Sequence, residues 1–261
     1  PCHISRGSST GSDKIYIIKT EEGKFYDYDG NAIEIEPDLL ITPIYATDFS
    51  RYSFSKKGNE LLLFPYKKDL NDCFKLIDEK DLKEFYPLTY EYLIRHQKEL
   101  KTRKQFNIWY AYSAARNLDL HSKADILIPL LANKGLFTIN NIKDNSTLMA
   151  GGGFSLSIKN ETLDPFFLLG LMNSKLLFYF LYKESNKFRG DYITCTKQYI
   201  ERLPIIKNWE NDQIPKLVNQ ILEIKSNNPE IVTTDLESQI DQLVYDLYGL
   251  TKEEIRIVEG K

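Results

Sequence analysis

The chain has 261 residues and a formal net charge of −3, with 42% hydrophobic and 27% charged residues. This length suffices for one large domain or two small ones, and the composition is typical of a globular protein. Three widely spaced cysteines without a Cys-x-x-Cys pair, and three histidines without ligand spacing, argue against a disulfide framework and a zinc site. This cysteine usage indicates a reducing, cytoplasmic environment.

The longest apolar run, residues 163–182, is interrupted by Asp164, Pro165 and Lys175. We therefore expect no membrane-spanning helix and no membrane partner. The sequence begins Pro-Cys-His without Met, so we expect a fragment of a longer protein.

Charge is distributed unevenly along the chain. Residues 1–207 contain 29 Lys or Arg and 26 Asp or Glu, whereas residues 208–261 contain 5 and 11. The window 95–143 contains 9 basic and 3 acidic residues. This distribution is compatible with binding a polyanion through the first part of the chain, although each single charge could equally be a solvated surface residue.

Short strands separated by turns are predicted for the N-terminal half, from runs of β-branched, aromatic and aliphatic residues. Asp29-Gly30 is a hairpin signal between two of these runs. The predicted strands lie within residues 15–18, 24–30, 39–42, 61–64 and 73–77.

A helix is predicted over residues 87–100, because Pro87 suits a first turn and the apolar residues Tyr90, Leu93 and Ile94 recur at helical spacing. The chain then returns to predicted strands at residues 126–131, 135–138 and 154–158.

The remainder of the chain is predicted to be mostly helical. Asp164-Pro165 suits the start of a helix that extends to about Lys183. Apolar residues then follow the helical period around residues 214–222 and 236–247. Further helix signals are predicted capping boxes at Thr234-Asp-Leu-Glu237 and Thr251-Lys-Glu-Glu254, and a helix end at Gly249.

The sequence contains no recognisable catalytic motif. A Gly-x-Gly-x-x-Gly cofactor turn, an Asn-Pro-Pro-aromatic loop, a Walker lysine motif and a Gly-x-Ser-x-Gly elbow are all absent. A metal-dependent nuclease could draw only on scattered carboxylates: Asp69, Asp72, Asp78, and Asp125 near Lys123. Carboxylates at this density occur on any protein surface, so we predict no catalytic, cofactor-binding or metal-binding residue.

Five separated segments in a fixed order, followed by a tail segment, carry a family resemblance. Among them are Arg6-Gly-Ser-Ser-Thr-Gly11 before a strand, and Leu171-Met-Asn-Ser-Lys175 followed by Phe188-Arg-Gly-Asp-Tyr192. The complete set comprises residues 6–18, 38–52, 60–66, 87–103 with Trp109-Tyr110, 171–205 and 240–250.

Together these segments resemble the TaqI-like C-terminal specificity domain, the target recognition domain of type IIG restriction–modification enzymes and related N6-adenine DNA methyltransferases. One departure is Thr42-Pro43, where the family often has Gly or Lys.

The resemblance implies an α+β fold. A mixed, short-strand recognition region is expected over residues 1–163, followed by a mostly helical supporting region with an acidic tail over residues 164–261. It also implies sequence-specific recognition of double-stranded DNA by a module without catalysis of its own. A separate N-terminal methyltransferase domain of the same parent chain would use S-adenosylmethionine, and Mg²⁺ if a nuclease domain is present.

Candidate DNA contacts are basic, hydroxyl and aromatic residues on predicted loops. Lysine, arginine, hydroxyls and backbone amides suit phosphates, and arginine also pairs with guanine. Trp109 and the aromatic residues 178–180 are more typical of a core. The candidates are Arg6, Ser8, Ser9, Thr10, Lys14, Arg103, Lys104, Arg116, Lys187, Arg189, Tyr192 and Lys197.

Two alternatives remain open from the sequence. One is a stand-alone metal-dependent nuclease, and the other is a protein-interaction scaffold that docks through its acidic helical tail.

Overall fold

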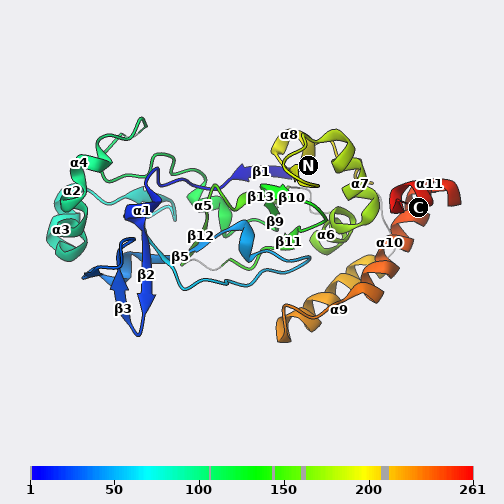
Figure 1. Cartoon of the computed structure of the whole chain (residues 1–261), viewed down its shortest axis with the longest axis horizontal. Coiled ribbons are helices and arrows are strands. Elements are labelled where there is room, and N and C mark those ends of the chain that lie inside the picture. The colour runs from blue at the N-terminus through cyan, green and yellow to red at the C-terminus, as the bar shows by residue number, and fades with distance from the viewer. Residues whose placement is uncertain (1, 106, 143–144, 160–162, 207–211, 261) are drawn as a thin grey trace.

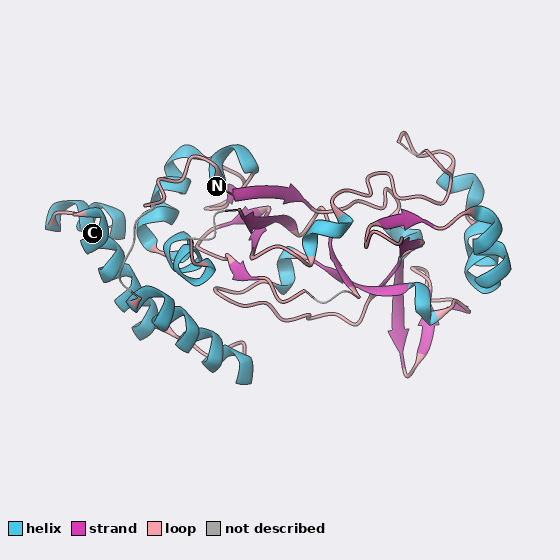
Figure 2. Cartoon of the chain, turned by 180° about the vertical axis from the view of Figure 1, so that it is seen from behind, coloured by secondary structure: helices cyan, strands magenta, loops and turns pink. Residues whose placement is uncertain are grey.

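The computed structural model describes residues 2–105, 107–142, 145–159, 163–206 and 212–260. The described part is elongated, with helices gathered at both ends and most strands between them (Figures 1 and 2). Mixed helices and small sheets confirm the predicted α+β class, with a group of helices at the C-terminal end.

The N-terminal lobe is built on a six-stranded sheet in the order β12-β5-β6-β2-β3-β4. β12 and β5 are parallel, and the other neighbours are antiparallel. The strands are β2 (Ile17–Glu21), β3 (Lys24–Tyr26), β4 (Ala32–Ile33), β5 (Leu40–Ile44), β6 (Leu61–Leu63) and β12 (Ser146–Leu148).

Short helices and one hairpin complete this lobe. The hairpin pairs β7 (Tyr66–Lys68) with β8 (Phe74–Leu76). The helices are α1 (Asp13–Tyr16), η1 (Pro37–Leu39), η2 (Ala46–Asp48), α2 (Glu79–Phe85), α3 (Pro87–Arg95) and α4 (Gln97–Leu100).

Tyrosine hydroxyls stabilise the core of this lobe through hydrogen bonds to backbone carbonyls. The Tyr16 hydroxyl donates to the Tyr110 carbonyl at 2.8 Å, and the Tyr110 hydroxyl donates to the Ile77 carbonyl at 2.7 Å. The Tyr112 hydroxyl donates to the Leu63 carbonyl at 2.6 Å. Each ring buries apolar area while its hydroxyl satisfies a buried backbone carbonyl, which explains much of the high tyrosine content.

A second, four-stranded antiparallel sheet occupies the middle of the molecule, in the order β1-β13-β9-β11. Its strands are β1 (Cys2–Arg6), β9 (Ile126–Pro129), β11 (Thr138–Ile139) and β13 (Gly153–Ile158). Beside it lie the short helix α5 (Leu118–His121) and a two-stranded sheet of β10 (Leu131–Ala132) and β14 (Ile193–Thr194).

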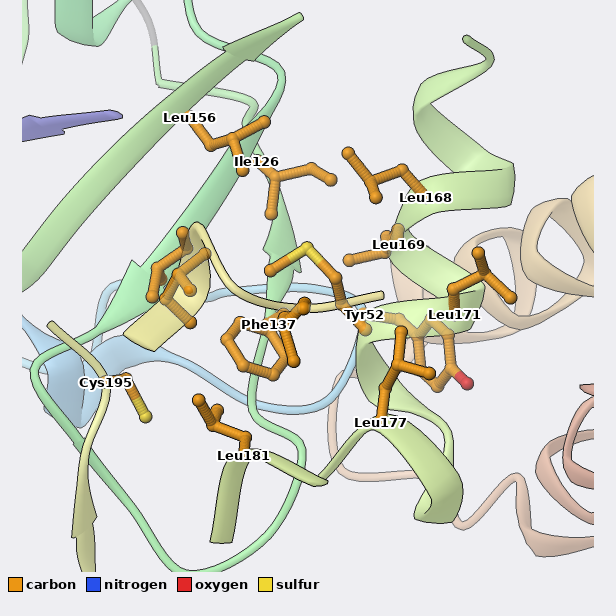
Figure 3. Close-up of a cluster of buried hydrophobic side chains, with 14 of the residues drawn as sticks. Tyr52, Ile126, Phe137, Leu156, Leu168, Leu169, Leu171, Leu177, Leu181 and Cys195 are labelled. Atoms are coloured by element: carbon orange, nitrogen blue, oxygen red, sulfur yellow. The ribbon is translucent and has the colours of Figure 1, made fainter. Parts of the chain in front are cut away.

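The C-terminal helices share one hydrophobic core with this middle sheet. Phe137 and Leu156 meet Leu168, Leu169 and leucines of the following helix in this core (Figure 3). α9 packs against both α6 and α10. The helices are α6 (Pro165–Asn173), α7 (Lys175–Glu184), α8 (Lys197–Ile200), α9 (Gln213–Asn227), α10 (Thr234–Tyr248) and α11 (Lys252–Glu259). Because this core joins residues on both sides of position 163, the expected division into two regions stays a prediction.

The single helix predicted from Asp164 to about Lys183 is in fact two helices. The Asp164 side chain accepts from the Phe167 amide at 2.8 Å, as the cap signal predicts. The helix ends at Ser174, whose backbone is extended, and buried Asn173 just before it bonds both the amide and the carbonyl of Phe137, at 3.1 and 2.8 Å. A new N-cap, Ser174, starts α7. Among the described residues no single helix is long and apolar enough to span a membrane, and α6 and α7, which pass that test only as a pair, are bent by 65°.

Other local predictions had mixed outcomes. Residues 15–16 are helical rather than extended, because the Ser12 carbonyl accepts from the amides of Ile15 and Tyr16. The predicted capping box at Thr234 is wrong, since the N-cap is Thr233. The capping box at Thr251 is confirmed, as is the helix end at left-handed Gly249. The predicted helix over residues 87–100 breaks at His96 into α3 and α4.

Candidate nucleic-acid interface

The turn that follows β1 passes between two other loops. The Ser8 amide donates to the Leu148 carbonyl at 2.9 Å, and the Ala150 amide donates to the Ser8 carbonyl at 2.6 Å. On the other side, Ser9 and Ala114 exchange backbone hydrogen bonds at 2.9 and 3.0 Å. The turn is therefore held by backbone bonds from both sides.

Two glycines allow this close passage. A Cβ atom at Gly7 would lie 2.3 Å from the Met149 carbonyl oxygen, which is a backbone atom that cannot move aside. Gly11 has a φ of +77°, and a Cβ atom there would lie 1.8 Å from the Ser113 hydroxyl. Gly7 and Gly11 in Arg6-Gly-Ser-Ser-Thr-Gly11 thus allow the turn to pass between the two neighbouring loops. We refer to this arrangement as the crossing of residues 6–11.

Arg103 connects the loop that follows α4 to the same turn through hydrogen bonds. Its guanidinium donates to three carbonyls: Leu100 at 2.9 Å, Thr10 at 2.7 Å and Trp109 at 2.6 Å. It also lies 5.8 Å from the centre of the Tyr16 ring. With these donors spent within the protein, Arg103 acts as an internal clamp, and we leave it out of the proposed DNA contacts.

The two most buried hydroxyl candidates are also used inside the protein. Ser8 is fully buried, and its hydroxyl donates to the Arg116 carbonyl at 2.8 Å. Thr10 is fully buried, and its hydroxyl donates to Asp13. These two residues position the turn, while Ser9 is half-buried and bonded through its backbone.

Arg6 and Arg116 are exposed and lie on directly connected segments. The Asn117 side chain donates to the Arg6 carbonyl at 3.2 Å, and Asn117 itself has a left-handed φ of 54°. The Arg116 carbonyl accepts from Ser8 and from His121, so its backbone is fixed while its side chain reaches solvent. The structure thus brings together the backbone segments of two arginines that are 110 positions apart in sequence.

His121 is the buried support of this arrangement. Its Nε2 lies 3.2 Å from the Arg116 carbonyl and its Nδ1 lies 3.0 Å from the Ser155 hydroxyl. A carbonyl can only accept, so the neutral ring carries its proton on Nε2, and Nδ1 accepts from Ser155. Burial lowers the pKa of His121 to about 4, which keeps the ring neutral near pH 7.

Two further lysine candidates lie near this turn in sequence. Lys14 is exposed and pairs with Asp29 at 3.5 Å, so part of its charge is compensated. Lys104 is exposed at the mouth of a cavity of about 740 Å³, whose wall includes Ser113 and Ala115. Since Ser113 donates its amide to Thr10, this cavity adjoins the turn itself.

The second basic cluster lies on another part of the fold. Residues 186–192 form the turn before β14, closed by backbone bonds such as that from the Phe188 amide to the Tyr192 carbonyl at 2.7 Å. The Lys187 ammonium donates to the Tyr182 carbonyl and lies over its ring. Its pKa is lowered by desolvation and then by nearby Lys183.

The other members of this cluster differ in whether the side chain already forms an ion pair within the protein. Arg189 and Tyr192 are exposed, whereas Lys197 pairs with Glu201 at 3.5 Å. The twelve candidates therefore fall into two groups. The first surrounds the crossing of residues 6–11, and the second surrounds the β14 turn.

Two amides beside Lys104 were not singled out from the sequence. Gln105 and Asn107 are exposed and border the same cavity. Their residue type was a usable signal in the sequence, because amide side chains are the usual partners of adenine. Without the loop geometry, however, nothing separated these two from other surface amides.

Two of the carboxylates considered for a nuclease, Asp72 and Asp125, serve structural roles. Asp72 pairs with Lys68 at 2.9 Å and Lys123 at 3.1 Å, and these hydrogen bonds lower its pKa. Asp125 accepts from the Ile158 amide at 2.7 Å. Within the described ranges, no group of three or more His, Cys, Asp or Glu side chains is placed to hold a metal ion.

Three comparisons with known proteins point in one direction. The family model for the TaqI-like C-terminal specificity domain matches residues 74–205. The type II methyltransferase M.BstVI of Geobacillus stearothermophilus is 24% identical over 261 residues, which cover 99% of this chain and 41% of that protein. The type IIL restriction-modification enzyme MmeI, solved in complex with DNA, superposes with a TM-score of 0.65 at 14% identity, covering 99% of this chain and 34% of that chain.

The fold and the family match define the class of this chain as a specificity domain. Because the matched residues make up half of the sequence, the chain belongs to the TaqI-like C-terminal specificity domain family. The resemblance found in the sequence motifs is thereby confirmed. The chain spans well under half the length of the relatives it matches.

Proposed function

We propose that this chain reads the sequence of double-stranded DNA for a larger methyltransferase or restriction–modification protein, without catalysis of its own. Membership of a specificity-domain family is the observation that carries the proposal. The likeness to M.BstVI and to the DNA-bound MmeI supports it.

The crossing of residues 6–11 supplies the contact surface in this proposal. Arg6 and Arg116 present guanidinium groups from backbone segments that are fixed by hydrogen bonds. A fixed backbone reduces the ordering cost of binding and holds each side chain over a defined base or phosphate. Arg189 and Tyr192 on the β14 turn would form a second contact.

The activity of the full protein is part of the proposal. An N-terminal domain of the same protein would transfer a methyl group from S-adenosylmethionine to an adenine N6 atom, and any nuclease domain would require Mg²⁺. This chain would clamp the duplex while the target base is turned out into the catalytic domain. We also propose a cytoplasmic location.

Selection from a random duplex library tests the proposal. The natural full-length protein is incubated with the library at about 50 mM salt, and bound duplexes are recovered and sequenced. A single recurring sequence of several base pairs supports a recognition module. Recovery of unselected duplexes, or of none while the protein is folded, contradicts it.

A further inference from the structure

Residues 101–105 and 107–117 lie in a loop that is fixed at both ends. At the start, Arg103 clamps the carbonyls of Leu100, Thr10 and Trp109. Towards the end, Ser113 and Ala114 donate their amides to the 6–11 turn. The part between them projects from the end of the molecule that carries α4 (Figure 1).

The exposed part of this loop borders the cavity of about 740 Å³. The ring of Tyr112, and that of Tyr66, are buried at its base. The rim carries Gln105 and Asn107, together with Ile108, which is 43% exposed.

The two amides have free hydrogen-bonding capacity. Among the described residues, the Gln105 and Asn107 side chains make no hydrogen bond to the rest of the protein. Each offers a carbonyl acceptor and an NH₂ donor in the fixed pairing that matches N6 and N7 of adenine in the major groove. Apolar Ile108, which lines the same cavity, suits the methyl group of the paired thymine.

Two basic residues favour the binding of DNA at the same surface. Lys104 borders the cavity, and Arg116 follows directly on its wall residue Ala115. These cations would hold the phosphates on either side of the bases that the amides approach.

We propose that Gln105 and Asn107 are specificity-determining residues that read A·T base pairs of the target sequence. This inference rests on the proposed function, since a protein that does not read DNA has no use for such residues. It adds the class of base that this surface selects and the two side chains that select it.

The test repeats the duplex selection with full-length Gln105→Ala and Asn107→Ala variants. Each is expected to lose the preference for one A·T pair, with affinity for the wild-type sequence falling about tenfold to hundredfold at that position. Lys104→Ala is the matched control, and it should weaken binding equally for all sequences and reduce the salt dependence. The midpoint of thermal unfolding should stay that of the wild type for all three variants, because all three side chains are exposed.

The outcomes separate the inference from the function on which it rests. If the wild type selects a sequence and both alanine variants select the same one with every A·T preference intact, the inference is overturned and the proposed function stands. A uniform loss over all sequences, as for Lys104→Ala, also overturns it. If the wild type itself selects nothing, both fall together.

Discussion

Lowering the pH should destabilise the protein through His121. Its pKa is about 4 in the folded protein, against about 6.5 for an unburied imidazole. Between these values the unfolded chain binds a proton that the folded chain does not. The stabilisation from keeping the ring neutral is therefore complete above about pH 6.5 and is lost as the pH falls through about 4.

The size of the effect follows from the same two values. Going from pH 7 to pH 4.5, the His121 contribution to the free energy of unfolding should fall by about 2.5 kcal/mol. Urea unfolding at both pH values measures the change for the wild type and for His121→Gln. The glutamine amide can still donate to the Arg116 carbonyl but does not titrate.

The difference between the wild type and His121→Gln isolates the effect of His121, because the carboxylates are the same in both proteins and contribute equally to the pH dependence of unfolding. The wild type should lose about 2.5 kcal/mol more than His121→Gln over this interval. Parallel pH profiles of the two proteins would refute the assignment of a neutral, buried His121.

Three further changes test hydrogen bonds that support the candidate interface or the helix α6. Arg103→Met removes three bonds to carbonyls and should lower the free energy of unfolding by about 3 kcal/mol, and a loss below about 1 kcal/mol in urea unfolding would contradict its role as a clamp. Asn173→Ala leaves the buried amide and carbonyl of Phe137 without partners and should cost about 2–3 kcal/mol by the same assay. Asp164→Ala removes the N-cap bond to Phe167 and should cost about 1 kcal/mol, whereas an unchanged midpoint would show that the cap is not used.

Local signals in the sequence predicted several helix starts and ends. Asp164-Pro165, Gly249 and the Thr251 capping box succeeded because a cap depends on residues within one turn of the helix. The break at Ser174 gave no local signal, and the contacts on either side of it, from Asn173 to Phe137 and from Lys175 to Asp241, join residues far apart in the sequence. An apolar run alone does not reveal such a contact.

The candidate site shows the same limit. The motif of residues 6–11 was found from its composition, but the sequence could not tell which of its side chains point outward. Ser8 and Thr10 turn inward to bond neighbouring segments, whereas Arg6 is exposed. Arg103 resembles a DNA contact by charge alone, and only its three carbonyl partners identify it as a clamp.

Equilibrium binding to the selected duplex tests whether Arg6 and Arg116, held by the crossing of residues 6–11, contact DNA. Fluorescence anisotropy would compare the full-length wild type with an Arg6→Ala, Arg116→Ala double variant. The control is Arg256→Ala, which removes an equally exposed arginine from α11.

The double variant should bind at least about tenfold more weakly, with an unchanged unfolding midpoint, while Arg256→Ala should bind like the wild type. If both side chains touch phosphates, the logarithmic salt dependence should also become shallower by about 2. Equal affinity of the double variant and the wild type would show that neither arginine contacts DNA.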